Sequence, residues 1–564
     1  MSAVRGSSFD RLRMSGAIES PRIYHGSVSG HSIRARAPHG DARAAPRIER
    51  DRDVLASFVE DAAHFPGGFA AGVAVPASEA EVAALIRSAP AVLPIGAQSS
   101  LTGGATPNGE IVLSTARLNR VLDSGADWVR IGAGVPLVDL DAALARSDRY
   151  YPPVPTFTGA FAGGIVATNA AGATTFKYGT TRDWVRALTV VLPGGEVLDL
   201  VRGETTAGPD GFFEIVLSDH AVRLRVPRYR MPDVPKLSAG YFAAPGMDLI
   251  DLFIGSEGTL GVITEVTLRV LPARPSMCLA FVPFDDRGAA LAFVRRMRDA
   301  ARETWRAHDP SGLDVAAIEH MDARCLAVLR EDGADRALGV AIPDAAAMAL
   351  LVTLELPAAM TSTQAFDDIG RARQPGAPVT PLVRFCRALD EAGVLDRVEI
   401  AVPGDRAREQ QLLALREAVP AGVNARVGRA KQNVDPRIAK TAADMIVPFE
   451  RLEELLTLYD EEFRRRGLDA AVWGHISDGN LHPNVIPRSM ADVESGRDAI
   501  LTFGREVIRL GGSPLAEHGV GRNPVKQQLL ADLYGADGID EMRAVKRALD
   551  PEYKLAPGVL FARA

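Results

Sequence analysis

Residues 94–104 read PIGAQSSLTGG and begin at the end of a short apolar run, residues 91–95, that has the composition of a strand. Glycines and hydroxyl side chains at the end of a strand can present successive backbone N–H groups to a diphosphate. A surface turn has a similar composition, so this stretch alone is compatible with a phosphate-binding loop or with an ordinary turn.

Two further glycine-rich blocks follow along the chain. Residues 163–172 read GGIVATNAAG, after the segment PPVPT at 152–156, and residues 253–265 read FIGSEGTLGVITE. Glycines separated by small residues allow the backbone to approach a large, flat group closely. The segment GAG at 132–134 also follows a strand-like run, but it lacks the third glycine of a dinucleotide-binding fingerprint.

In this order and spacing, the three blocks resemble the FAD-binding domain of the vanillyl-alcohol oxidase superfamily, in the branch of D-lactate, glycolate and D-2-hydroxyglutarate dehydrogenases. The resemblance implies an α+β fold, with a two-subdomain FAD-binding domain, an α+β cap domain built on an antiparallel sheet, and a C-terminal helical segment. No His or Cys stands in residues 94–104, which favours non-covalent FAD. The residues that the resemblance places at FAD are Gly96, Ala97, Gln98, Ser99, Ser100, Gly103, Gly104, Pro155, Thr156, Gly163, Gly164, Ile165, Asn169, Gly172, Tyr178, Glu257, Gly258 and Ile263.

A histidine-bearing segment, GHISDGNLHPN, occupies residues 474–484. Its Asp-Gly pair predicts a two-residue type I′ turn, which would place His475 directly opposite His482. Opposed cross-strand residues have Cβ atoms roughly 4.5–5.5 Å apart. Two imidazoles at that separation can share a divalent metal, or they can form an ordinary hydrogen-bonded pair.

The segment PLAEHGVG at residues 514–521 adds a carboxylate and another imidazole. Two His and one Glu leave coordination positions open, which is typical of a catalytic metal site. The resemblance assigns His475, His482 and Glu517 as ligands of a divalent metal, zinc by preference, and His518 as the catalytic base. It also implies that Asn484 contacts the substrate.

Cations for an anionic substrate come mainly from arginine, because the chain holds 7 Lys against 57 Arg. Arg416, expected at a helix end before Pro420, resembles the carboxylate-binding arginine of the family. Lys440 approximates the family lysine but stands two residues early, with Arg429 and Lys431 as rivals.

The chain length and the pattern of predicted helices and strands indicate several domains in 564 residues. We expect a disordered or non-core extension at 1–48, the FAD-binding domain at 49–275, a cap or substrate domain at 276–470, and at 471–564 a C-terminal segment that carries the metal hairpin and closes over the flavin. In the cap, helices are predicted over 291–302 and 316–330. Residues 1–48 carry eight Arg against three acidic residues, so the rest of the chain has a net negative charge. This charge gives no electrostatic argument for nucleic-acid binding.

The hypothesis is oxidation of a D-2-hydroxy acid, such as D-lactate, to the 2-oxo acid with hydride transfer to FAD. The expected electron acceptor is a quinone, a cytochrome or another flavoprotein, and a homodimer is compatible with the sequence. No apolar run is long enough to span a membrane, and three widely spaced cysteines favour the cytoplasm, with peripheral membrane association open. The alternatives are a flavoenzyme of the ether-lipid synthase type, a non-catalytic flavin electron-transfer subunit, and a structural metal protein without flavin.

Overall fold

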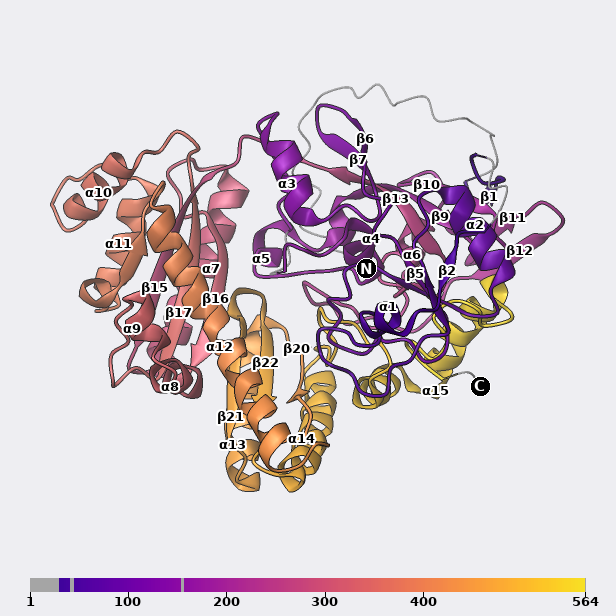
Figure 1. Ribbon diagram of the computed structural model, residues 1–564. Coiled ribbons are helices and arrows are strands. Elements are labelled where there is room, and N and C mark those ends of the chain that lie inside the picture. The colour runs from indigo at the N-terminus through magenta and orange to yellow at the C-terminus, as the bar shows by residue number, and fades with distance from the viewer. Residues whose placement is uncertain (1–29, 41–44, 154–156, 563–564) are drawn as a thin grey trace.

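The computed structural model describes residues 30–40, 45–153 and 157–562. These residues form the domain that is predicted to bind FAD, called the flavin domain below, at the right of Figure 1, and the predicted cap domain, at its left. The predicted extension at 1–48 lies mostly outside the described residues.

The first flavin subdomain contains a four-stranded sheet in the order β2-β3-β5-β4. Its strands are β2 (Ile48–Glu49), β3 (Gly72–Ala74), β5 (Ile111–Ser114) and β4 (Val92–Ile95). The helix α2 (Glu79–Ser88) begins where Ser78 accepts a hydrogen bond from the backbone N–H of Glu81. The glycine loop 96–104 begins where β4 ends, so the strand fixes the start of the loop.

The second flavin subdomain is built on an antiparallel sheet in the order β10-β9-β13-β7-β6. Its strands are β10 (Val197–Val201), β9 (Val185–Val191), β13 (Val262–Arg269), β7 (Trp128–Gly132) and β6 (Val121–Ser124). The short helix α4 (Ala162–Ala167) carries the second glycine block and packs against this sheet. A Cβ on Gly163 would lie 2.7 Å from the Cβ of Ala133, so this close approach requires glycine.

Smaller elements complete the flavin domain. Two minor sheets pair β1 (Ser32–Arg34), β11 (Phe212–Val216) and β12 (Ala221–Arg225), and β14 (Leu271–Pro272) with β8 (Arg149–Tyr150). The helices are α1 (Arg52–Ala56), α3 (Leu137–Ala145), α5 (Thr175–Tyr178), η1 (Thr181–Trp184) and α6 (Ile250–Phe253).

The cap domain is built on an eight-stranded sheet in the order β18-β15-β17-β16-β21-β22-β19, with β20 also paired to β22. Its strands are β15 (Ser276–Phe284), β16 (Val315–Asp322), β17 (Met348–Leu356), β18 (Glu399–Ala401), β19 (Thr441–Ala442), β20 (Met445–Ile446), β21 (Ala470–His475) and β22 (Asn480–Val485). The histidine segment therefore continues the cap sheet.

Helices cover both faces of the cap sheet. One face packs against α7 (Arg287–Ala307), α11 (Pro381–Glu391), α13 (Leu452–Arg466) and α14 (Met490–Arg509), and the other against α8 (Ala323–Glu331) and α12 (Arg406–Asn433). The remaining helical elements are α9 (Ala334–Leu338), α10 (Ser362–Arg371), η2 (Leu395–Arg397) and η3 (Phe449–Arg451).

Two predictions about the cap are wrong. The helix predicted over 316–330 is the strand β16 followed by α8, because a central position in the sheet overrides the helix propensity of its Ala, Glu and Met residues. Arg416 does not end a helix, because α12 continues through Pro420 to Asn433. The backbone hydrogen bond that Pro420 cannot donate is lost, while packing on either side of the proline holds the helix together.

After the cap, the chain returns to the flavin domain. In Figure 1 the helix α15 (Pro524–Leu549) lies beneath the flavin domain. Leu555 pairs with Val92 of β4, and Arg522 donates to the carboxylate of Glu110 at 2.7 Å. A Cβ on Gly521 would lie 2.3 Å from the carbonyl oxygen of Thr102. Residues 521–555 therefore brace the first glycine loop.

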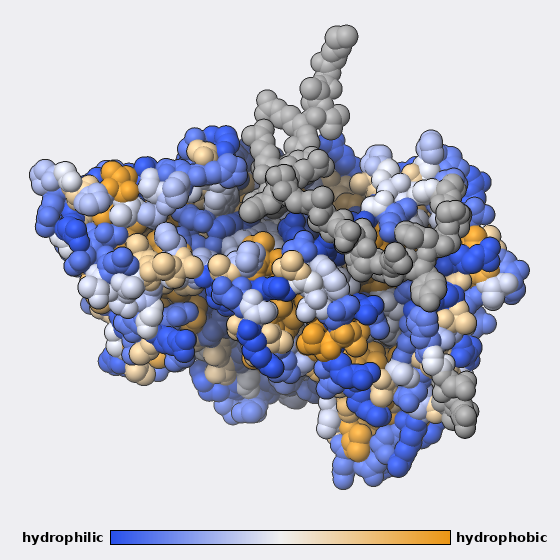
Figure 2. Space-filling model, turned by 90° about the horizontal axis from the view of Figure 1, so that it is seen from above, coloured by the Kyte–Doolittle hydropathy of each residue, from blue (hydrophilic) through white to orange (hydrophobic). Residues whose placement is uncertain are grey.

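Buried polar contacts also join the flavin domain to the cap. The Lys177 ammonium lies 2.7 Å from the Asp314 carboxylate, and the Tyr178 hydroxyl donates to Glu355 at 2.6 Å. On the face shown in Figure 2, hydrophobic residues form separate patches among hydrophilic ones. Within the described ranges, no helix has the length and hydrophobicity to cross a membrane.

Candidate active site

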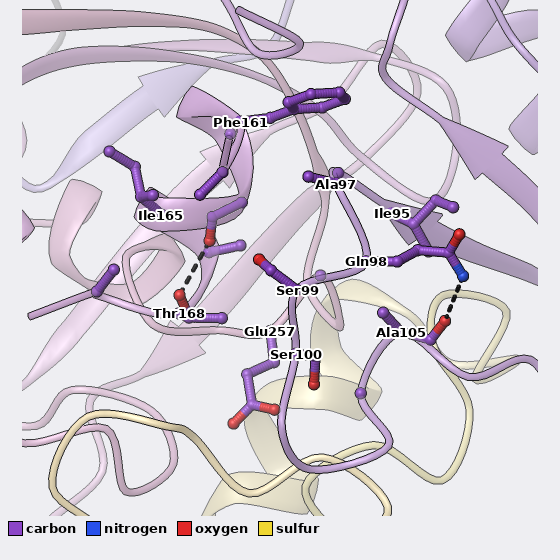
Figure 3. Close-up of a pocket in the computed structure, with 18 of the residues that line it drawn as sticks. Ile95, Ala97, Gln98, Ser99, Ser100, Ala105, Phe161, Ile165, Thr168 and Glu257 are labelled. Carbon is purple, nitrogen blue, oxygen red and sulfur yellow. Dashed lines mark hydrogen bonds between the residues drawn. The ribbon is translucent and has the colours of Figure 1, made fainter. Parts of the chain in front are cut away.

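A cavity opens where the three glycine blocks meet, and Figure 3 shows part of its wall. The first loop, α4 with the turn after it, and the segment around Glu257 form most of the wall. Glu517 and His518 also line this cavity. The structure therefore brings the predicted flavin-binding blocks, the predicted metal ligand Glu517 and the predicted base His518 to one space.

Most of the predicted FAD contacts lie in this wall. They are Gly96, Ala97, Gln98, Ser99, Ser100, Gly104, Gly163, Gly164, Ile165, Glu257, Gly258 and Ile263. Gly103, Asn169, Gly172 and Tyr178 lie outside the lining, and Pro155 and Thr156 fall outside the described residues.

Several predicted contacts hold the loops in shape. The Gln98 side chain donates to the carbonyl of Ala105, as Figure 3 shows, so only its backbone and stem face the cavity. Asn169 has a positive φ of 47°, and its side-chain oxygen accepts the backbone N–H of Arg182. Sequence reasoning missed Phe161, two residues before the glycine block, and Thr168, inside it, although both line the cavity.

The histidine hairpin differs from its predicted register. Trp473 lies opposite His482, and His475 lies opposite Asn480, with the 3-10 turn η4 (Ile476–Asp478) between the strands. A type I′ turn needs positive φ at both central residues, whereas Gly479 has a φ of 87° and Asp478 is not in that region. The Ser477 hydroxyl accepts the backbone N–H of Ile318, which stabilises the longer turn.

His475 and His482 are therefore diagonal neighbours on one face of the hairpin, with ring centroids 5.5 Å apart. The Glu517 Oε1 atom lies 3.3 Å from His475 Nε2, 3.3 Å from His482 Nε2 and 3.5 Å from His518 Nε2. One ligand atom from each of His475, His482 and Glu517 lies within 4.8 Å of the others. The three predicted ligands thus converge on one point.

A second layer of charged groups surrounds these ligands. Glu319, on β16, contacts His475 Nδ1 and accepts a hydrogen bond from Arg416 Nε at 2.7 Å. Burial alone would raise the pKa of Glu319, but Arg416 and His475 together lower it to about 2. Arg416 is therefore held by Glu319, and its Nη1 also donates to Glu417 at 2.9 Å.

Lys236 connects the flavin domain to this cluster. Its buried ammonium group lies 3.0 Å from Glu517 Oε2, 3.0 Å from Asp478 Oδ2 and 3.3 Å from the carbonyl oxygen of Gly172. Burial alone would lower the pKa of Lys236, but Asp478 and Glu517 outweigh it and raise the pKa. Lys236 thus holds Glu517 in place as a charged residue.

Two carboxyl groups, the buried Asp444 and the half-buried Glu257, accept backbone N–H groups from the segment 517–521. Asp444 Oδ2 accepts those of Glu517 at 2.7 Å and His518 at 2.8 Å. Glu257 accepts those of Val520 and Gly521, each at 2.8 Å. Asp444 belongs to the cap and Glu257 to the flavin domain, so the segment is held from both sides.

The three imidazoles differ in exposure. The exposed side-chain fraction is 28% for His518, against 2% for His475 and 6% for His482. The His518 ring stacks on that of His482, with centroids 5.1 Å apart, and lines the cavity. His518 is therefore the imidazole that a substrate could reach most readily.

The other predicted substrate contacts, Asn484 and Lys440, differ in their burial and in their partners. Asn484 is buried and donates to the carbonyl of His482 at 2.8 Å, while its Oδ1 has no hydrogen-bond partner among the described residues. Lys440 lies just before β19, is exposed, and makes no ion pair with a described residue. Its rivals Arg429 and Lys431 lie near the end of α12.

Comparison with protein families gives two matches. Residues 70–200 match the FAD binding domain family, and residues 276–560 match the C-terminal domain of FAD linked oxidases. The second match covers half of the chain. The chain belongs to the FAD-linked oxidase family. This FAD-linked oxidase is a flavin-dependent oxidoreductase, as the sequence predicted.

Curated relatives match this FAD-linked oxidase over most of their length. A D-2-hydroxyglutarate dehydrogenase of Xanthomonas citri pv. viticola is 31% identical over 505 residues, which cover 87% of this chain and 89% of the relative. A D-lactate dehydrogenase of Anaerostipes hadrus is 29% identical, covering 85% and 87%. These matches confirm the predicted resemblance to the D-2-hydroxyacid dehydrogenase branch.

Solved structures show the same fold. The 4-ethylphenol oxidase from Gulosibacter chungangensis superposes on this FAD-linked oxidase with a TM-score of 0.60 at 17% identity, covering 91% of this chain and 94% of the other. An alkyldihydroxyacetonephosphate synthase gives 0.57 at 15% identity, covering 91% and 82%. The predicted α+β fold with an FAD-binding domain is confirmed.

Proposed function

We propose that the protein oxidises a D-2-hydroxy acid, of the D-lactate type, to the 2-oxo acid with FAD as the oxidant. The observation that carries the proposal is that Glu517 and His518 line the same cavity as the flavin-binding glycine blocks. A hydroxy acid bound at these residues would lie beside the flavin. The names of the relatives, D-2-hydroxyglutarate and D-lactate dehydrogenases, support this substrate class.

The cavity residues fit FAD. A Cβ built on Gly164 would meet no atom within 4 Å, so the backbone of α4 faces open space. The loop 96–104 lines the same cavity, and we place the diphosphate at its backbone N–H groups. FAD, when bound, accepts the hydride from the substrate Cα, while the protein supplies position and electrostatics.

The donor set of His475, His482 and Glu517 fits a divalent metal, and zinc in particular. Ligand atoms on a tetrahedron with bonds of 2.0–2.1 Å lie about 3.3–3.4 Å apart. Glu517 Oε1 lies 3.3 Å from the Nε2 atom of each of His475 and His482. A metal held here would polarise the substrate hydroxyl and carboxylate.

The remaining residues have roles as binding groups and base. His518, reaching the cavity next to Glu517, takes the proton of the substrate hydroxyl. Asn484, with its unpartnered buried oxygen, and Arg416 hold the polar groups of the substrate from the cap side. Lys440 is proposed to add positive charge for the anionic substrate, as the sequence predicts.

Electrons from the reduced flavin pass to an external acceptor, for which a quinone, a cytochrome or another flavoprotein is our proposal. The cysteines of the described residues, Cys278, Cys325 and Cys386, are buried and unpaired, so they offer no internal relay. A homodimer and a cytoplasmic location, with or without peripheral membrane association, are predictions from the sequence.

Anaerobic mixing with a panel of D- and L-2-hydroxy acids tests the proposed reaction. We expect at least one D-acid to bleach the flavin absorbance, and its L-enantiomer to leave the flavin oxidised, because the metal, His518 and the flavin face fix the orientation of the Cα–H bond. The spectrum before and after mixing gives the result. A flavin that no D-acid reduces would contradict the proposed oxidation and favour the electron-transfer alternative.

FAD affinity should depend on pH through Glu257. Burial raises the pKa of Glu257 to about 7, although the N–H groups of Val520 and Gly521 and the charge of Lys526 oppose the shift. Glu257 Oε2 lies 3.6 Å from the position of a Cβ on Gly104, in the loop proposed to bind the diphosphate. As the pH rises through this pKa, the carboxylate becomes negative and repels the diphosphate.

We therefore expect the FAD dissociation constant to rise by up to about tenfold per pH unit above pH 7, the limit for one linked proton. Titration of apoprotein with FAD on both sides of pH 7 measures it. Glu257→Gln carries no ionisable group and should flatten the dependence. An equal slope in the variant would show that another group titrates.

A further inference from the structure

The three imidazoles of the site share one arrangement. Each presents its Nε2 atom to Glu517 Oε1, at 3.3 Å for His475 and His482 and at 3.5 Å for His518. Each also presents its Nδ1 atom to a buried carboxylate on its other side. An Nδ1–H directed at a carboxylate leaves the Nε2 lone pair free for a metal or a proton, and it fixes the plane of the ring.

The carboxylates are shared unequally among the rings. Of the three rings, Glu319 contacts that of His475, through its Nδ1 atom. Asp444 lies 3.5 Å from His482 Nδ1 through Oδ1 and 3.5 Å from His518 Nδ1 through Oδ2. One carboxylate therefore faces both the proposed metal ligand and the proposed base.

Asp444 is itself rigidly held. It is fully buried, and it follows β19 and directly precedes β20, which pairs with the hairpin. Its Oδ1 accepts the Asn480 side-chain amide at 2.8 Å, and its Oδ2 accepts the backbone N–H groups of Glu517 and His518. These contacts leave its carboxylate little freedom to rotate.

We propose that Asp444 is a positioning residue that sets the orientation of His482 and His518 together, and so couples the metal ligand to the base. The inference rests on the proposed function. His482 Nδ1 has no hydrogen-bond partner among the described residues, and a small rotation of the ring would close its 3.5 Å contact with Asp444. Metal binding at Nε2 would favour that hydrogen bond.

A competing explanation is that Asp444 only holds the backbone of residues 517–521. Glu257 separates the two explanations, because it accepts two backbone N–H groups of the same segment, from Val520 and Gly521, and forms no ion pair with an imidazole among the described residues. Loss of charge at Glu257 and at Asp444 should therefore perturb the segment similarly, while only Asp444 acts on the rings.

The test uses Asp444→Asn and Glu257→Gln in the full-length, FAD-saturated protein. The Asn side-chain oxygen can still accept the N–H groups of Glu517 and His518, but the amide no longer offers both rings a charged acceptor. Zinc affinity is measured by competition with a chelator, zinc content by elemental analysis, and folding by thermal melting.

We expect Asp444→Asn to weaken zinc binding by about 10- to 100-fold, the usual effect of losing an outer partner of a metal-bound His. Glu257→Gln should weaken zinc binding less than Asp444→Asn does, because Glu257 contacts the segment only through backbone N–H groups, and both variants should melt cooperatively. Equal zinc affinity in Asp444→Asn and wild type would overturn the inference, as would equal losses in both variants.

Metal stoichiometry gives an independent check. Asp444, His482 and His518 could themselves hold an ion. One zinc per chain in the wild type supports positioning by Asp444, whereas two, falling to one in Asp444→Asn, would make Asp444 a ligand and overturn it. A wild type that binds no zinc would also overturn it.

Different experimental outcomes would contradict the role of Asp444 and the proposed reaction. A wild type that binds zinc through an Asp444-dependent site, with a flavin that no D-2-hydroxy acid reduces, would uphold the positioning role and reject the reaction. A reducible flavin with unchanged zinc affinity in Asp444→Asn would do the reverse.

Discussion

The His518→Asn variant is expected to bind FAD and metal normally and to lose most of its ability to reduce the flavin. Asn fills part of the space of the imidazole but cannot accept the hydroxyl proton at neutral pH. General-base catalysis contributes roughly 10²- to 10⁴-fold, so the rate of flavin reduction by a D-2-hydroxy acid should fall by that factor. Anaerobic stopped-flow absorbance measures this rate.

His308→Asn is a matched control for this change. His308 is exposed at the C-terminal end of α7 and has a φ of 52°, a conformation that Asn tolerates well. Its replacement should leave flavin reduction unchanged. A His518→Asn variant with the wild-type rate would remove His518 as the base.

The Glu517→Gln variant is expected to lose the metal and, with it, turnover. Glu517 Oε1 is the atom on which all three Nε2 atoms converge, and Oε2 pairs with the buried Lys236. A neutral amide is a weak ligand, and it leaves the ammonium group of Lys236 with Asp478 as its remaining carboxylate partner. Breaking a buried ion pair on one side costs roughly 3–5 kcal/mol, so the melting temperature should also fall.

Elemental analysis and thermal melting check both expectations. Glu417→Gln is the control, because Glu417 pairs with Arg416, is half exposed, and is not one of the predicted metal ligands. It should keep its metal and its melting temperature. A Glu517→Gln protein with full metal content would contradict the proposed ligand set.

Sequence motifs predicted the glycine blocks and the His and Glu residues of the site, but not the buried charged residues that contact them. Glycine blocks and His/Glu segments have recognisable spacing, so the flavin cavity and its meeting with Glu517 and His518 followed from short motifs. Glu319 was missed because residues 316–322 have helix-forming composition, and only their central place in the sheet makes them a strand. A short segment carries no information about such long-range pairing.

Asp444 and Lys236 show the same limit. Asp444 comes before the hairpin in the chain, and Lys236 lies 281 residues from Glu517, yet both contact residues of the 517–518 segment. The register of the hairpin was mistaken for a related reason, since the turn is shaped by the hydrogen bond between Ser477 and β16 as well as by its own Asp-Gly pair. Local turn preferences alone predicted a shorter loop.

The bracing of the first glycine loop by residues 521–555 has a consequence for the synthesis of the protein. The loop belongs to the N-terminal part of the chain, but Gly521, Arg522 and Leu555 complete its surroundings. A nascent chain emerges from the N-terminus, and its domains usually fold in that order. Here the first glycine loop gains its final support only after the cap has left the ribosome, so we expect the cap to fold while the flavin domain is still incomplete, and FAD to bind stably only after residues 521–555 have joined that domain.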